Sequence, residues 1–166
     1  MRGTAIVLWL LLGCFGGTLK ALAVSEYAPL YRFFLFLPAQ FASAWSGLAY
    51  TEEAGIYRFP GFVLDYSCAG INFCILCLVT AAFASTGSAR KILNSAMIAV
   101  VISVSAWAMT QLANLIRIAL SLKLLPLSTG RPWLHEAIGS IVFLFFLIVF
   151  YLLYKGIIHA RTRPAH

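Results

Sequence analysis

The stretch Asp65-Tyr66-Ser67-Cys68-Ala69-Gly70-Ile71-Asn72-Phe73 is a short polar patch that carries a thiol. An apolar run of helix length follows at once, so this patch marks the point where the chain enters a predicted membrane span. Two further polar sites lie downstream, at Asn114/Arg117 and at His135. The fold and the function are predicted from how these places relate to one another.

The composition indicates an integral membrane protein. Of the 166 residues, 62% are hydrophobic and 10% are charged, and the mean hydropathy is +0.93. A soluble domain carries about 25% charged residues, so this chain has too little polar surface to cover a water-soluble globule. The net charge of +7 comes without a basic run or interleaved basic and aromatic residues, so no nucleic-acid partner is expected. No cysteine or histidine spacing indicates a metal site, and no cofactor is expected.

The predicted fold class is an all-α polytopic membrane protein of one domain with about four transmembrane helices. Their approximate bounds are 4–24, 68–88, 92–120 and 135–154. The first run contains Leu11-Leu12-Gly13-Cys14, which looks like a lipoprotein cleavage box. Because the rest of the chain spans the membrane anyway, an uncleaved first helix is the better interpretation.

The segment between the first two spans is predicted to lie at the membrane surface. Residues 27–50 are aromatic and apolar, but Pro29, Arg32 and Pro38 interrupt them, which indicates an interfacial or re-entrant helix. Residues 55–66 alternate in the manner of a strand and contain turn residues, which predicts an extended arm leading to Cys68. A loop is predicted at 123–133, around Pro126, Gly130 and Pro132.

The basic residues predict the orientation. With four spans, the basic residues next to the spans share the side of both termini, which the positive-inside rule assigns to the cytoplasm. These residues are Arg2, Arg90, Lys91, Lys155, Arg161 and Arg163. A fifth span at 27–50 would separate Arg2 from the others. All five acidic residues fall on the opposite, extracytoplasmic side: Glu26, Glu52, Glu53, Asp65 and Glu136.

This topology brings three reactive groups to one face of the membrane. Cys68 opens the second span on the outer side, and the 25 helical steps from Ile92 to Arg117 rise roughly 37 Å, enough to reach the same interface. His135 opens the fourth span there. A helix N-terminus stabilises a thiolate and favours neutral histidine, while arginine can hold a carboxylate or an oxyanion. Asn114 shares a helix face with Arg117 and could orient it or accept a substrate amide.

The same residues also have structural interpretations. Cys68 alone could be a small apolar filler, Arg117 could extend to the headgroups, and His135 could cap a helix. Asp65 and Glu136 are expected to be interfacial or to support the site rather than to react. The convergence of the three groups favours a catalytic site.

The pair Cys74 and Cys77 indicates a competing function. A C-x-x-C sequence is typical of thiol–disulfide oxidoreductases, some of which are small membrane helix bundles that pass electrons to quinone. The two thiols lie about 9 and 13.5 Å into the second span among apolar neighbours that disfavour the thiolate. No second cysteine pair occurs in an outer loop to relay electrons. A non-enzymatic membrane assembly subunit is a third alternative.

At these positions the chain resembles the exosortase/archaeosortase family of membrane cysteine transpeptidases. Cys68-Ala69-Gly70-Ile71 is similar to that family's Cys-(Ser/Ala)-Gly motif, Asn114-Leu115-Ile116-Arg117 to its Asn-x-x-Arg, and His135-Glu136-Ala137-Ile138-Gly139 to its histidine before a glycine. The order of the motifs agrees, and the resemblance covers roughly residues 20–150. The short length and the amino-acid sequence around Cys68 and Asn72 look most like the compact exosortase K subgroup, as does the stretch near Glu53 and Gly55-Ile56-Tyr57.

The resemblance implies catalytic roles for Cys68, Arg117 and His135, with Asn114, Asp65, Asn72 and Glu53 binding substrate or supporting the site. The implied substrates are secreted proteins whose C-terminal sorting signal has a short motif, an apolar helix and a basic tail. Cys68 would form a thioester that water or an outside nucleophile resolves. The implied location is the cell (inner) membrane, with lipid around the spans. Larger family members have about eight spans, which raises the question of an oligomer or an accessory membrane partner.

Overall fold

The apolar runs form four long helices, α1 (Arg2–Val24), α3 (Ile71–Ser85), α4 (Ile92–Ser128) and α5 (Pro132–Thr162). The computed structural model describes residues 2–85, 92–128 and 132–162. Each of the four contains or adjoins a helical stretch long and apolar enough to cross a bilayer. A helix satisfies its own backbone N–H and C=O groups, which lipid cannot do. The predicted fold class, an all-α polytopic membrane protein, is confirmed.

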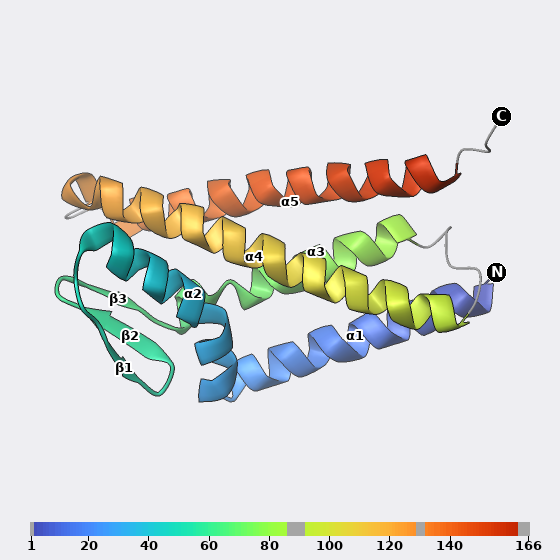
Figure 1. Cartoon of the computed structure of the whole chain (residues 1–166), viewed down its shortest axis with the longest axis horizontal. Coiled ribbons are helices and arrows are strands. Elements are labelled where there is room, and N and C mark those ends of the chain that lie inside the picture. Colours follow the sequence, from blue (N-terminus) through green and yellow to red (C-terminus); the bar gives the residue numbers. More distant parts are fainter. Residues whose placement is uncertain (1, 86–91, 129–131, 163–166) are drawn as a thin grey trace.

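The four long helices run in alternating directions. α1 begins and α5 ends at the same end of the bundle, and the connection from α2 to α3 lies towards the other end (Figure 1). α4 is the central helix, because it contacts α1, α2, α3 and α5. Small buried side chains on α3 and α4, including Ala81, Cys77, Ala106 and Ala113, permit the close approach.

The described parts of the helices differ in length. α3 has 15 described residues up to Ser85, whereas α4 has 37 and α5 has 31. The chain enters α3 through a short 3-10 turn, η1 (Tyr66–Ala69), rather than through a longer helix. The predicted loop at 123–133 is shorter than expected, because α4 continues through Pro126 and Pro132 begins α5 at a position where proline is favourable. Residues 129–131 lie outside the described part.

The segment predicted as interfacial or re-entrant does form a helix, α2 (Ala28–Ser46). Pro29 stands in its first turn, and the helix continues through Pro38 with a change of direction visible in Figure 1. It ends at Gly47, whose φ of 70° is left-handed and whose N–H donates to the Ser43 carbonyl at 2.8 Å. Whether α2 is interfacial or re-entrant stays a prediction.

The predicted extended arm is folded into a small antiparallel sheet. Its strands are β1 (Thr51–Glu53), β2 (Ile56–Phe59) and β3 (Phe62–Leu64), in the order β1-β2-β3. Tyr57 and Phe59 on β2 and Leu64 on β3 are buried, so one face of the sheet packs on the protein. The sheet and α2 lie together beside one end of the bundle (Figure 1).

Candidate active site

The thiol of Cys68 lies in a turn that a carboxylate holds in shape. Asp65 accepts hydrogen bonds from the Ser67 backbone N–H at 2.9 Å and from the Ser67 hydroxyl at 2.6 Å. The Cys68 N–H donates to the Asp65 carbonyl at 2.9 Å. Asp65 therefore acts on this turn as a cap, and its predicted role in supporting a catalytic site stays a prediction.

The sequence predicts that Cys68 lies at the N-terminus of a helix. In the structure Cys68 lies before the first turn of α3. α3 begins at Ile71, and Gly70 between them is left-handed with φ 69°. The Cys68 side chain is 5% exposed, and its sulfur lies 3.9 Å from the Ser67 hydroxyl oxygen. The thiol thus precedes the helix N-terminus by one tight turn, and the hydroxyl beside it belongs to the residue that Asp65 holds.

Gly70 is where α4 meets this turn. A Cβ at Gly70 would lie 3.0 Å from Asn114 Nδ2, 3.1 Å from Asn114 Oδ1 and 3.1 Å from Thr110 Cγ2. Only glycine combines the left-handed backbone with so close a neighbour. The contact fixes the Asn114 amide against the residue that lies two positions after Cys68.

A row of buried polar side chains continues along α4 from this contact. Gln111, Asn114 and Arg117 are 5%, 0% and 6% exposed. The Gln111 and Asn114 side chains each have both amide atoms buried without a hydrogen-bond partner in the described part of the chain, and so do Nε and Nη2 of Arg117. Successive members are three residues apart, which places them on neighbouring turns of one stripe. Buried polar groups in proteins are normally paired, so the amide and guanidinium groups of this row can bind a polar partner.

Arg117 is positioned by α5 rather than by an acid. A Cβ at Gly139 would lie 3.4 Å from the Arg117 Cδ, and the guanidinium carbon is 5.3 Å from the centre of the Phe143 ring. Phe143 in turn stacks on Phe73 of α3 at 4.7 Å. The ion pairs among the described residues involve Arg32 and Arg58, not Arg117. The guanidinium is therefore buried on an aromatic face with its charge uncompensated there.

His135 lies in the first turn of α5, four residues before Gly139. One helical turn separates this backbone position from Gly139, which meets Arg117. The position of its imidazole lies outside the described part of the structure. The backbone thus brings the three predicted catalytic positions onto adjoining elements, η1, α4 and α5.

A cleft of about 380 Å³ borders the turn. It is lined by Ser67, Gly70 and Asn72 from the turn and α3, and by Lys20 of α1 and Phe143 of α5. The Lys20 ammonium donates to the Asn72 Oδ1 at 2.9 Å. Asn72, predicted to bind substrate or support the site, therefore lines a cleft together with the Lys20 ammonium, a cation that the sequence did not single out.

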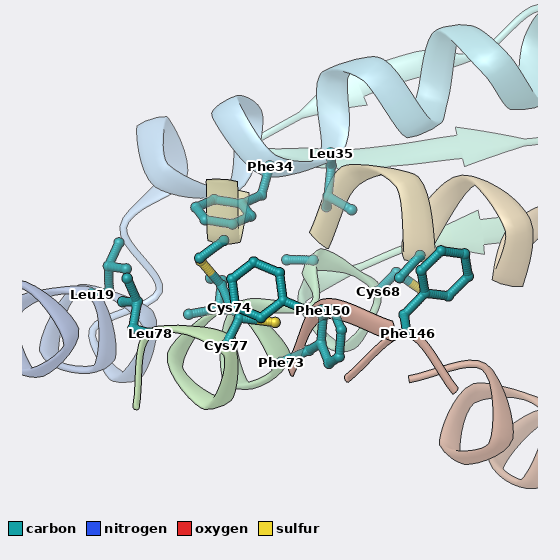
Figure 2. Close-up of a cluster of buried hydrophobic side chains, with 14 of the residues drawn as sticks. Leu19, Phe34, Leu35, Cys68, Phe73, Cys74, Cys77, Leu78, Phe146 and Phe150 are labelled. Atoms are coloured by element: carbon teal, nitrogen blue, oxygen red, sulfur yellow. The ribbon is translucent and has the colours of Figure 1, made fainter. Parts of the chain in front are cut away.

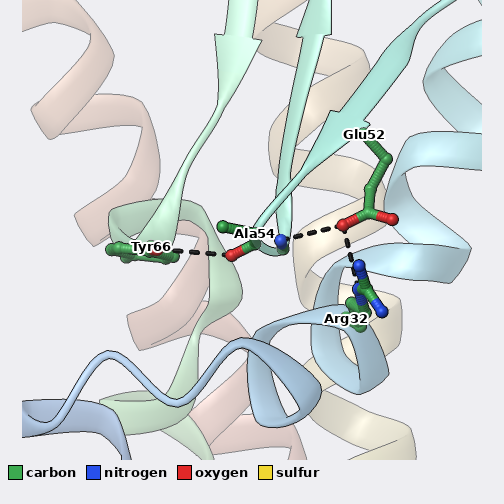
Figure 3. Close-up of polar contacts among 5 residues, drawn as sticks. Arg32, Glu52, Ala54 and Tyr66 are labelled. Carbon is green, nitrogen blue, oxygen red and sulfur yellow. Dashed lines mark hydrogen bonds and ion pairs between the residues drawn. The ribbon is translucent and has the colours of Figure 1, made fainter.

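Glu53 and its neighbour Glu52 have different surroundings. The side chain of Glu53 is 81% exposed and lies 4.0 Å from Arg58 on the next strand, so the structure does not bring it near Cys68. Glu52 instead accepts from the Arg32 Nε and from the Gly55 N–H, both at 2.9 Å, which ties the sheet to α2 (Figure 3). These contacts lower the pKa of Glu52, the Gly55 N–H most strongly.

Tyr66 connects the sheet to the turn that holds the thiol. Its hydroxyl donates to the Ala54 carbonyl at 3.3 Å (Figure 3), and its ring lies 4.2 Å from that of Tyr31 on α2. Burial is the main reason why the pKa of Tyr31 is raised, and the Tyr31 hydroxyl donates to the Ala23 carbonyl at 2.8 Å. The sheet and α2 therefore both contact η1, in addition to the contact that α4 makes at Gly70.

Cys74 and Cys77 lie within the apolar core. They are 1% and 0% exposed, and Figure 2 shows them among Phe34, Leu78 and other apolar side chains, with Cys68 at another edge of the cluster. All four cysteines are free thiols, and Cys14 is exposed. The apolar surroundings predicted for the C-x-x-C pair are confirmed.

Comparison with known proteins gives no further guide to the site, because no family model, curated protein or solved structure matches the chain. The functional argument therefore rests on the residues themselves. Gln111 and Lys20 are the site residues that the sequence did not single out. The signal for Gln111 was its spacing of three residues from Asn114 on an otherwise apolar span.

Proposed function

We propose that this membrane protein is a cysteine peptidase or transpeptidase that cleaves C-terminal sorting signals of secreted proteins through a thioester on Cys68. One observation carries the proposal. Within the described part of the chain, a buried arginine without an acidic partner and a buried asparagine without a hydrogen-bond partner lie on a membrane-spanning helix, and that helix packs directly on the turn that holds the thiol. Ionisable residues inside a membrane are expensive and mark functional sites.

The proposed reaction begins with attack of the Cys68 sulfur on the scissile carbonyl. The thiol proton passes to the His135 imidazole, and the negative charge that develops on the carbonyl oxygen is stabilised by Arg117 and by the Asn114 amide. When the carbon–nitrogen bond breaks, the leaving amine takes the proton from His135. Water or an amine nucleophile then attacks the thioester and releases the thiol.

The surroundings of Arg117 favour an oxyanion or carboxylate as its ligand. A guanidinium that is desolvated, stacked on Phe143 and not paired with an acid gains most from an anion that forms beside it. A purely structural arginine would be expected to carry a carboxylate partner or to reach the headgroups. Neither applies among the described residues, because Arg117 is 6% exposed and forms no ion pair there.

The proposed location is the inner membrane, with both termini in the cytoplasm and the site on the extracytoplasmic side. The positive-inside rule supports it through Arg2, Lys155 and Arg161 at the ends of α1 and α5. The substrate's own apolar helix would lie in the bilayer beside the bundle, and the scissile segment would enter the cleft at Lys20 and Asn72. An oligomer or an accessory membrane partner is part of the same proposal.

The test is processing of a reporter in cells that produce the protein. The reporter is a secreted protein from the source genome that ends in a short motif, an apolar span and a basic tail, with an epitope tag placed before the motif. Cys68→Ala, Arg117→Ala and His135→Ala are expected to abolish its shortening, whereas Cys14→Ala, at an exposed thiol, leaves it unchanged. Normal processing by Cys68→Ala would refute the proposal.

The same experiment separates the competing functions. A thiol oxidoreductase requires Cys74 and Cys77 and tolerates loss of Cys68, which is the reverse sensitivity. A non-enzymatic assembly subunit tolerates each of five single changes, at Cys68, Arg117, His135, Cys74 and Cys77. Matched protein levels in the membrane, measured by immunoblot, exclude loss of folding as the cause of any defect.

A further inference from the structure

Two buried side-chain amides have no hydrogen-bond partner among the described residues, and they lie on the stretch of α4 that meets Gly70. Gln111 and Asn114 lie about 4.5 Å apart along the axis of α4, and all four of their amide nitrogen and oxygen atoms are buried without a hydrogen-bond partner in the described residues. Trp107, one turn before Gln111, has its indole N–H in the same condition. The polar row therefore extends deeper along α4 than the motif of Asn114 and Arg117.

Such a pair is unfavourable unless it has a polar partner. A buried amide without a partner costs about 1–3 kcal/mol, and an apolar side chain of similar size would avoid that penalty. Neighbouring positions on α4, including Ala113 and Ile118, are apolar and buried. The helix thus tolerates apolar residues around these amides, so packing alone does not call for glutamine at position 111.

The chemistry of the pair selects its ligand. A primary amide is neutral and offers two N–H donors and one carbonyl acceptor, so its best complement is a group that both donates and accepts. Hydrocarbon offers neither, and a helix has already used its own backbone groups internally. A peptide segment in extended conformation has free N–H and C=O groups, and in a dry site it must find partners for them.

We propose that Gln111 and Asn114 bind the main chain of the extended substrate segment that carries the scissile bond. This inference rests on the proposed function. Because Asn114 also touches Gly70, the segment that it holds passes beside the turn of Cys68. Recognition by backbone hydrogen bonds makes this part of the site indifferent to side-chain identity, and it explains how an unfolded peptide can be held within a membrane protein.

The test combines a protein variant with a modified substrate. Gln111→Leu removes the hydrogen-bonding groups at nearly constant volume, and Gln40→Leu makes the same change at an exposed position of α2. Purified protein is supplied with a synthetic peptide copied from the processed region of the reporter, and cleavage is followed by mass spectrometry. A parallel set of peptides has single backbone N–H groups near the scissile bond replaced by ester oxygens.

The expected result is cleavage about 10-fold slower for Gln111→Leu, with unchanged or increased thermal stability, and normal cleavage for Gln40→Leu. One ester peptide should be cleaved about 10-fold more slowly by the wild-type protein and no more slowly than its parent by Gln111→Leu, because the two changes remove the same hydrogen bond. This coupling is a signature that a merely structural glutamine does not produce.

The inference is overturned if Gln111→Leu is more stable and cleaves at the wild-type rate, which is the result expected if the amide binds only water. It is also overturned if every ester peptide is cleaved by the wild-type protein like its parent, a measurement that does not depend on any variant folding. The proposed function fails separately, when Cys68→Ala cleaves normally. A protein that requires Cys68 but is insensitive to Gln111 would refute the backbone-binding role alone.

Discussion

Replacement of Gly70 by alanine should destabilise the protein through two effects that can be separated. The left-handed backbone, with φ 69°, costs an L-residue about 1–2 kcal/mol. The new methyl group would also lie 3.0–3.1 Å from Asn114 and Thr110, and the overpacking adds about 1–3 kcal/mol. We expect Gly70→Ala to lose about 2–5 kcal/mol of unfolding free energy in all.

Gly47 provides the matched control, because it has nearly the same φ, 70°, and no atom within 4 Å of its Cβ position. Gly47→Ala should therefore lose only the backbone part, about 1–2 kcal/mol. Both variants are compared by equilibrium unfolding in mixed detergent micelles. Equal losses in the two variants would show that α4 leaves room at Gly70, and the close packing of Asn114 on the turn would be refuted.

Three further perturbations test the site and its support. Arg117→Lys keeps a positive charge but loses the planar guanidinium. Reporter processing in pulse-chase experiments should therefore fall at least 10-fold, while the level of the protein in the membrane stays unchanged. Normal processing would mean that any cation suffices at this position. Asp65→Ala removes the cap of the turn and should lower the unfolding free energy by about 1 kcal/mol, whereas no loss would argue against a capping role. The Gly55 N–H, aided by Arg32, lowers the pKa of Glu52. The stability that the ionised Glu52 carboxylate contributes is therefore present above its unfolded-state pKa and is lost as the pH falls through its folded-state pKa. Glu52→Gln should flatten that acidic limb of a melting-temperature profile, and an unchanged limb would contradict the assignment.

The number of spans and the nature of each segment could be predicted because they depend on local sequence. Apolar runs of sufficient length have few alternatives to membrane helices, and the strand-like alternation of residues 55–66 already indicated an extended arm. Proline was a weaker guide. Pro38 and Pro126 lie inside helices, since the helix continues wherever packing compensates for one lost backbone hydrogen bond.

The shape of the site could not be predicted, because it depends on contacts between distant segments. The 3-10 turn at Cys68 exists because Asp65 caps it and because Gly70, which has no Cβ, lets Asn114 and Thr110 of α4 approach closely. Neither effect is visible in a hydropathy pattern. Likewise, the sheet register decides that Glu52 rather than Glu53 faces Arg32. Spacing brought Asn114 and Arg117 together, but only burial distinguished Gln111 from an ordinary polar residue.

The irregular backbone at the start of the second span has a consequence for how that span is covered. The stretch that is long and apolar enough to cross a bilayer runs from Tyr66 to Ser85, so it includes the η1 turn. Backbone groups that a helix does not pair need protein cover in apolar surroundings. The sheet and α2 supply such cover, because Tyr66 contacts the Tyr31 ring of α2 and the Ala54 carbonyl. The turn that carries Cys68 is thus the place where this span gives up helical pairing without presenting unpaired backbone to lipid.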